Sequence, residues 1–341
     1  MEKGWNGLPY YSISDRYKSV FGAKVYKIPV AVVDDCPNRL GLKGMQTCSF
    51  CDVWGSAARS EAFELPLVEQ INKYRDHIRN KFKAEKFLVY FQAYTNSFAK
   101  INDLEKNFKD ALLCGQDIAG FVIGTRPDCL SMSLFKLWQH YHEQTYVSVE
   151  LGIQSFYEDD LEFFRRGHKA SESLHAIKRI KELTSVDLGI HLIFGSPYET
   201  DERIKESALI CNELPITNVK LHNLHVLKNT ALEVLYNKGE FTPISLDLYA
   251  HRVQIFLENL RPDIAIHRLS AFSSRYDELI APAWTNNKMG THQAIIDHLR
   301  RESSYQSRFY QPKTDSEILK IKDLAIQGLP KTSPESSLNL L

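Results

Sequence analysis

Residues 28–51 read IPVAVVDDCPNRLGLKGMQTCSFC, an apolar run followed by a loop that holds three of the six cysteines. Cys48 and Cys51 are separated by two residues, a spacing that lets both thiols point at one metal centre. Cys36 precedes them across a loop with two glycines, which accept backbone angles that other residues avoid. The pattern predicts a metal-binding loop directly after a strand.

Several kinds of site are compatible with these three thiols. Three cysteines leave one position of a four-iron cluster without a protein ligand, and an open position is what a catalytic metal site needs. A structural zinc site wants four nitrogen or sulfur ligands, and no second Cys-x-x-Cys or Cys-x-x-His pair supplies the fourth. A disulfide suits an odd set of three poorly. An iron–sulfur cluster is favoured, with zinc and unligated thiols as alternatives.

Apolar runs alternate with segments of helical periodicity along the chain. Six strands are expected at 28–33, 87–91, 121–123, 146–151, 188–194 and 218–221, with an amphipathic helix between each pair after the cysteine loop. Short apolar strands that alternate with helices predict a parallel sheet covered by helices. Six such units predict an α/β fold, a partial (β/α)6 TIM-type barrel, with its chemistry at the carboxyl ends of the strands.

The remaining segments are expected to flank this barrel. We divide the chain into an N-terminal extension at 1–24, the barrel at 25–235, a small C-terminal extension at 236–330 and a frayed tail at 331–341. The extension is predicted to contain a helix at 246–256 and an added strand at 265–269. We interpret it as a small lid that closes the open side of the barrel.

Composition limits the class of protein. The 341 residues are 43% hydrophobic and 25% charged, as in a globular protein. No apolar run approaches the roughly 18–20 residues that span a bilayer, and the N-terminus lacks a signal-peptide core, so we expect a cytoplasmic location without membrane association. The formal net charge of zero lacks the electrostatic footprint of a dedicated nucleic-acid binder.

The cysteine loop resembles a known cofactor-binding loop. Cys48-Ser49-Phe50-Cys51, with an aromatic residue before the last cysteine, resembles the cluster loop of radical S-adenosylmethionine (SAM) enzymes. Cys36-Pro37-Asn38-Arg39 and the preceding residues 21–27 resemble the YhcC-like branch, which is related to the elongator catalytic subunit and to oxygen-independent coproporphyrinogen oxidase. The resemblance implies that Cys36, Cys48 and Cys51 bind a 4Fe-4S cluster. It further implies that SAM is reductively cleaved to a 5′-deoxyadenosyl radical that abstracts hydrogen from a substrate.

The same resemblance implies SAM-binding positions at the strand ends. The turn after the second strand would receive the methionine amino group of SAM. The end of the fourth strand would bind the ribose or the edge of SAM that faces the substrate, and the turn after the fifth strand would bind the adenine. Independently, a glutamate in an apolar strand is costly unless its carboxylate is satisfied, so Glu150 is expected to face a polar cavity. The implied SAM-binding residues are Phe50, Gln92, Tyr94, Thr95, Asn96, Glu150, Gln154, Arg166 and Gly195.

Four further residues are candidates for binding the substrate. Arg126 could hold a carboxylate or phosphate through two parallel hydrogen bonds, and Asp128 could accept from a hydroxyl or a cation. His222 and His225 alternate out of an apolar run, a pattern equally typical of structural histidines. No catalytic residue is assigned.

The substrate is left open as a small molecule or RNA, an RNA base being one option. We expect an electron donor such as flavodoxin or ferredoxin. The competing function is a non-catalytic, zinc-stabilised nucleic-acid-binding module. That function predicts four metal ligands, a concentrated basic surface and no pocket at the strand ends.

Overall fold

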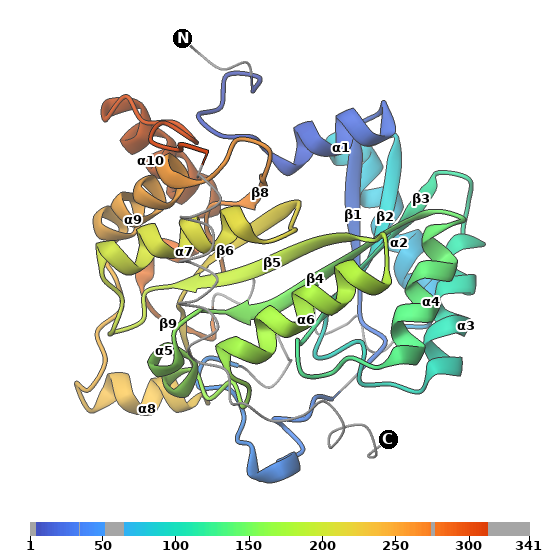
Figure 1. Cartoon of the computed structure of the whole chain (residues 1–341), viewed down its shortest axis with the longest axis horizontal. Helices are drawn as coiled ribbons and strands as arrows, with labels where there is room; N and C mark the ends of the chain where they lie inside the picture. Colours follow the sequence, from blue (N-terminus) through green and yellow to red (C-terminus); the bar gives the residue numbers. More distant parts are fainter. Residues whose placement is uncertain (1–4, 34, 52–64, 274–276, 313–341) are drawn as a thin grey trace. The chain divides into compact units, whose positions relative to one another are not determined.

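Seven parallel strands form one curled sheet, a half-barrel, in the order β1-β2-β3-β4-β5-β6-β8 (Figure 1). The computed structural model describes residues 5–33, 35–51, 65–273 and 277–312. The strands are β1 (Val25–Val30), β2 (Lys86–Phe91), β3 (Ile118–Thr125), β4 (Tyr146–Gln154), β5 (Asp187–Phe194), β6 (Asn218–Asn223) and β8 (Ala265–Arg268). The predicted partial TIM-type barrel is confirmed, and the strand predicted at 265–269 is its seventh strand.

The first strand ends earlier than its apolar sequence predicts. β1 pairs with β2 residue for residue, from Val25 opposite Lys86 to Val30 opposite Phe91. Beyond this point, Gln70 takes over both backbone groups of Ala31: its Oε1 accepts from the N–H at 2.9 Å and its Nε2 donates to the carbonyl at 2.9 Å. Because a side chain satisfies this residue, the chain leaves the sheet. The predicted strand at 28–33 is therefore corrected to Val25–Val30.

Helices cover the outer face of the sheet (Figure 1). In this layer Phe108 stacks on Phe121 with ring centroids 4.5 Å apart, so a helix and a strand share one apolar core. The covering helices are α2 (Leu67–Phe82), α3 (Ile101–Leu112), α4 (Met132–His142), α6 (Ala170–Leu183) and α7 (Asp201–Glu213), as the periodicity predicts. Within the described part of the chain, no helix is long and apolar enough to cross a membrane.

The inner face of the sheet has two kinds of surface, because alternate strand residues point to it. Near the amino ends of the strands, Val25, Leu88 and Ala265 pack against Ile13 and Tyr17 of α1 (Ile13–Phe21), which closes that end. Further along the strands, the inner positions become polar and charged. The sequence predicts strands that are apolar throughout. In the structure the outer face of the sheet is apolar, whereas the inner face is apolar only near the amino ends of the strands.

The chain after β6 packs against the same sheet. It forms β7 (Val226–Leu227), α8 (Ala231–Asn237), α9 (Leu246–Asn259), β8, β9 (Leu279–Ala281) and α10 (Lys288–Arg301), and β7 pairs antiparallel with β9. α9 packs on α7, and α10 packs on α9. Gln306 ties this region to the N-terminal segment, because its Oε1 accepts from the Tyr11 N–H at 2.9 Å. The domain boundaries stay predictions, and the predicted tail at 331–341 lies outside the described residues.

Candidate functional site

The cysteine loop, residues 36–51, begins beyond the carboxyl end of β1. Cys36 and Cys48 are buried and Cys51 is half-buried. The loop makes one short 3-10 turn at Leu42–Gly44, and Gly41 adopts a left-handed φ of 64° before it. A residue with a side chain would be strained at that angle. Gly41 thus allows the loop to turn, as expected of the loop glycines.

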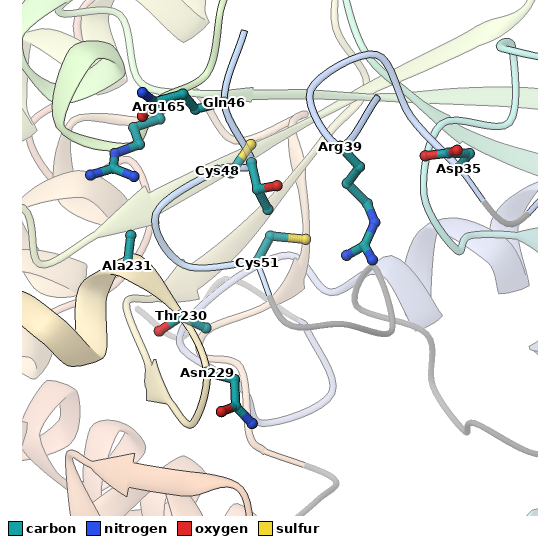
Figure 2. Close-up of a pocket in the computed structure, with 10 residues that line it drawn as sticks. Asp35, Arg39, Gln46, Cys48, Cys51, Arg165, Asn229, Thr230 and Ala231 are labelled. Atoms are coloured by element: carbon teal, nitrogen blue, oxygen red, sulfur yellow. The ribbon is translucent and has the colours of Figure 1, made fainter. Parts of the chain in front are cut away.

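A cavity of about 630 Å³ lies beside Cys48 and Cys51 (Figure 2). Arg39 from the loop and Arg165 from the segment after α5 (Glu158–Phe163) contribute to its wall, and residues 229–231 at the start of α8 line another part of it. This volume falls within the roughly 300–1,000 Å³ that is usual for small-molecule sites. Two of the three cysteines line this cavity, and none of the residues predicted to bind SAM does.

Two buried side chains donate to the sulfur of Cys48. Asn38 Nδ2 lies 3.4 Å and Arg166 Nη1 lies 3.2 Å from Sγ. Asn38 Nδ2 also donates to the carbonyls of Gln46 at 2.9 Å and Arg165 at 2.8 Å, which ties both limbs of the loop to the segment after α5. A cationic donor favours the thiolate, the form in which cysteine binds metals. The sequence does not single out Asn38, because its partners are backbone groups brought together by folding.

The last turn of the loop is anchored on two helices. Phe50 meets Phe164 edge to face, with ring centroids 5.7 Å apart. The Ser49 N–H donates to the Phe164 carbonyl at 3.0 Å, and the Leu232 N–H of α8 donates to the Ser49 carbonyl at 2.9 Å. Phe50, implied to bind SAM, thus packs against the protein and helps to position the cysteines.

The three thiols interact electrostatically with one another. Burial, followed by the neighbouring Cys48 and Cys36 thiols, raises the pKa of Cys51 to about 12, although Arg39 and Arg166 act to lower it. Metal ions reverse such a shift, because they bind the thiolate. Among the described residues, no group of three His, Cys, Asp or Glu side chains is close enough to hold a single metal ion. A four-iron cluster binds each cysteine through a different iron, so a set of three interacting thiols fits this group.

The turn after β2 carries buried polar atoms. Thr95 and Asn96 are each 1% exposed, and neither Thr95 Oγ1 nor Asn96 Oδ1 has a hydrogen-bond partner within the described residues. Asn96 Nδ2 donates to two backbone carbonyls at 3.1 Å, which fixes the amide. Arg39 lies over the ring of Tyr94, 5.2 Å from its centroid, so this turn adjoins the cysteine loop. Gln92, at the start of the turn, is half-buried.

Arg126 and Asp128 pair with each other. Nε and Nη2 of Arg126 donate to the two carboxylate oxygens at 2.9 and 2.8 Å, and Nη2 also donates to the Arg166 carbonyl at 2.8 Å. Burial would raise the pKa of Asp128, but the bonds from Arg126 outweigh it and hold that pKa below its ordinary value. Both predicted substrate ligands are therefore engaged within the protein, where they position the backbone of Arg166.

Glu150 lies on the inner face of β4 and is 1% exposed. Lys27 Nζ donates to its carboxylate, His191 Nε2 lies at 2.8 Å and Lys220 Nζ at 3.4 Å. Burial alone would raise the pKa of Glu150, but Lys27, Lys220, His267 and His191 hold it well below its ordinary range. Charged partners thus satisfy the buried carboxylate, and that it faces a polar cavity stays a prediction. Its partners are missed by sequence reasoning, because they come from separate strands with no common spacing.

The ends of β4 and β5 have unusual backbone angles. Gln154 has a φ of 72° at a register shift in the pairing of β4 with β5. Gly195 has a φ of 107°, and its N–H donates to Glu199 at 2.9 Å. A Cβ at Gly195 would lie 3.0 Å from Ile244, so a larger residue would crowd this turn. The carboxylate of Glu199 is buried and paired with Arg252 of α9.

Two predicted histidines lie at the carboxyl end of β6. Arg268 Nη2 donates to His222 Nδ1 at 2.6 Å, and the His222 ring centroid lies 5.2 Å from that of His191. His225 Nε2 has no hydrogen-bond partner within the described part of the chain. Burial, with Arg268 adding to it, lowers the pKa of His222 well below its usual range and that of His225 to about 4. Both rings are therefore neutral near pH 7.

Known proteins resemble the chain over nearly its whole length. The family model described as the radical SAM superfamily matches residues 32–210, and the one described as the radical SAM C-terminal domain matches residues 216–301. The uncharacterized protein YtqA of Bacillus subtilis is 31% identical, over 90% of this chain and 96% of its own length. Protein YhcC of Escherichia coli is 29% identical, over 84% of this chain and 90% of its own.

A solved structure has the same fold. It is the archaeal Elp3 of Methanocaldococcus infernus with an N-terminal deletion, which superposes with a TM-score of 0.64 at 16% identity. The match covers 83% of this chain and 64% of that chain. At this level of identity the likeness concerns the fold alone.

Proposed function

The chain belongs to the radical SAM superfamily and is an enzyme, and we propose that Cys36, Cys48 and Cys51 bind a 4Fe-4S cluster and that the cavity beside them binds SAM. When bound, these groups supply reductive cleavage of SAM and a 5′-deoxyadenosyl radical that removes a hydrogen atom from the substrate. The protein's own residues must hold the thiolates, receive SAM and exclude water.

The observation that carries this proposal is the cavity of about 630 Å³ with Cys48 and Cys51 in its wall. Three cysteines leave one iron of a four-iron cluster without a protein ligand. An adjoining cavity of small-molecule size is what a ligand of that iron requires. Asn38 and Arg166 support the proposal, since both donate to Cys48 Sγ and hold this sulfur in place.

The turn at 92–96 is proposed to receive the methionine part of SAM. The buried oxygens of Thr95 and Asn96 that lack hydrogen-bond partners within the described residues support this role, because an ammonium group would satisfy them. Arg166 is proposed to attract the carboxylate, and Arg165, which lines the cavity, adds a second cation.

The remaining contacts are proposed along the strand ends. Gln154 would bind the ribose of SAM, and the backbone at Gly195 would bind its adenine. Glu150 would contact SAM on the edge that faces the substrate, because its carboxylate already lies inside the half-barrel. Reducing electrons would come from a donor such as flavodoxin or ferredoxin. The substrate itself stays open at this level, as a small molecule or RNA.

The test is anaerobic reconstitution with iron and sulfide, followed by dithionite and SAM, with assay of 5′-deoxyadenosine. We expect wild type to bind four irons and form the nucleoside. Cys36→Ala, Cys48→Ala and Cys51→Ala should each lose the cluster absorption and the product. Cys114→Ala is the matched control, because this thiol lies outside the loop and donates to the Asp110 carbonyl at 3.3 Å.

Folded wild-type protein that binds no cluster and makes no nucleoside would refute the proposal. Colourless protein with stoichiometric zinc after anaerobic preparation would favour the zinc-stabilised module instead. Equal loss of iron in Cys114→Ala and the loop variants would also count against it, because the loop would then have no special role.

A further inference from the structure

Seven charged or imidazole side chains meet inside the half-barrel, away from the cysteine loop. We call this set the interior cluster, and it consists of Lys27, Glu150, His191, Lys220, His222, His267 and Arg268. They come from β1, β4, β5, β6 and β8. An apolar layer with α1 closes the amino end of the strands below them. A molecule in contact with the cluster would therefore face the carboxyl end, where the cysteine loop lies.

The interior cluster contains one carboxylate, which pairs with both lysines and lies close to two histidines. Glu150 pairs with Lys27, with Lys220 at 3.4 Å and with His191 at 2.8 Å, and His267 Nε2 lies 3.5 Å away. Lys220 Nζ also donates to the Tyr90 hydroxyl at 2.9 Å. The lone carboxylate is thus saturated by its neighbours and has no capacity left for a further cation.

Arg268 is left without a carboxylate. Its Nη2 donates to His222 at 2.6 Å and its Nε to the Leu221 carbonyl at 3.4 Å. No described carboxylate lies within ion-pair distance of it. Lys27, Lys220 and Arg268 thus give three cations against Glu150 alone, a surplus that is costly at a buried position unless an anion compensates it.

The protonation equilibria show the same imbalance. Burial, together with Arg268 and Lys27, lowers the pKa of Lys220 to about 7 against the opposing effect of Glu150. Burial also lowers the pKa of Arg268. Both cations are therefore destabilised as the structure stands, and a bound anion would relieve them.

The donors of the interior cluster are slightly more exposed than the carboxylate that they contact. Their side chains are 10% exposed for Lys27, 8% for Lys220, 14% for His191 and 16% for His267, against 1% for Glu150. His267 Nε2 also has no hydrogen-bond partner within the described residues. The cations therefore surround the buried carboxylate and present their donors toward the interior of the half-barrel.

We propose that the interior cluster binds an oxyanion, a carboxylate or phosphate group, of a small-molecule substrate, with Arg268 and Lys220 as its main ligands. A planar guanidinium suits both groups, because it can donate two parallel hydrogen bonds. That the bound molecule is the substrate of hydrogen abstraction rests on the proposed function. The anion site itself follows from the charges inside the half-barrel.

The test is calorimetric titration of the full chain with inorganic phosphate and, separately, with acetate, in buffer free of both. We expect one anion to bind per chain. Arg268→Gln should weaken binding about tenfold or more, because hydrogen bonds to charged groups exceed the roughly 1.4 kcal/mol that corresponds to that factor. Glu150→Gln should tighten binding, because it removes the competing carboxylate. Arg300→Gln, at an exposed position on α10, should keep wild-type affinity.

Binding of phosphate, acetate or both supports the proposal, and the preference tells which group the substrate carries. Absence of binding to wild type at tens of millimolar anion, or unchanged affinity in Arg268→Gln, overturns it. If Glu150→Gln does not fold, the comparison of anion affinity between Arg268→Gln and Arg300→Gln decides whether the proposal stands. Nucleoside formation by wild type is measured separately. Anion binding without 5′-deoxyadenosine would keep the anion site and remove the proposed function, together with the role of the bound molecule as its substrate. Formation of 5′-deoxyadenosine without anion binding would remove only this inference.

Discussion

The cysteine loop and the interior cluster belong to one half-barrel but are built in opposite ways. The loop takes its three thiols from residues 36–51, beside a cavity of about 630 Å³. The interior cluster takes its side chains from five strands, and Lys27 and Glu150 are 123 residues apart in sequence. Thiolates suit metal cations, whereas the surplus lysines and arginine of the interior cluster suit the anion that we propose binds there.

This difference separates two tasks of the enzyme. A loop of contiguous residues can assemble its metal ligands almost independently of the sheet, so its chemistry is transferable within a family. A cluster shared among strands depends on register and twist, and each change in one strand alters the set. We therefore expect variants in the loop to change the cofactor, and variants in the interior cluster to change folding and substrate choice.

The largest expected effect is on stability, from Glu150→Gln. Removing the only carboxylate of the interior cluster leaves buried cations without compensation, which should lower the free energy of unfolding by about 3–5 kcal/mol. Urea unfolding in phosphate-free buffer measures it, and added phosphate should restore part of the loss. Asp110→Asn is the control, because this carboxylate pairs with Lys106 at the surface and should cost less than about 1 kcal/mol. Equal losses of unfolding free energy in the two variants would show that Glu150 stabilises the protein no more than a surface carboxylate does.

A smaller effect is expected at the loop, from Arg166→Gln. Removing the cationic donor to Cys48 Sγ should stabilise the oxidised cluster and lower its reduction potential. The expected shift is on the order of 59 mV, a tenfold change in a one-electron equilibrium. Redox titration followed by electron paramagnetic resonance, without SAM, measures it. Arg166→Lys should recover part of the potential, and Arg165→Gln should shift it less. A larger shift in Arg165→Gln would show that Arg166 does not tune the sulfur.

A separate effect is the pH dependence set by the interior histidines. Burial lowers the pKa of His191 to about 4 and that of His225 to about 4, whereas an unfolded histidine titrates near 6.5. Between these values the unfolded chain binds more protons, so stability is full above about pH 6.5 and falls as the pH drops toward 4. Urea unfolding across this range measures the slope.

His225→Gln isolates one part of that slope. It should reduce proton uptake on unfolding by close to one proton at pH 5, and leave the curves of variant and wild type parallel above pH 7. An unchanged slope at pH 5 would mean that His225 titrates alike in both states. The interior would then be more open to water than its burial indicates.

Much of the fold is predictable because periodicity is a local property. The helices follow from apolar residues at every third or fourth position, and a local signal also begins α7, where Thr200 caps the helix by accepting from the Arg203 N–H at 3.3 Å. The strand ends are less predictable. Apolar composition extends the first strand to Val33, whereas Gln70, distant in sequence, ends it at Val30 by binding Ala31.

Sequence by itself determined the cysteine loop, the order of strands and helices, and the family, because each is encoded in contiguous residues. Tertiary structure alone decided that Arg126 pairs with Asp128 and positions Arg166, that Asn38 and Arg166 reach Cys48, and that Lys27 and Lys220 share the carboxylate of Glu150. The physical reason is that a charge inside a parallel sheet is balanced across neighbouring strands. Those strands are joined by long helical connections, so no spacing along the chain records which residues meet.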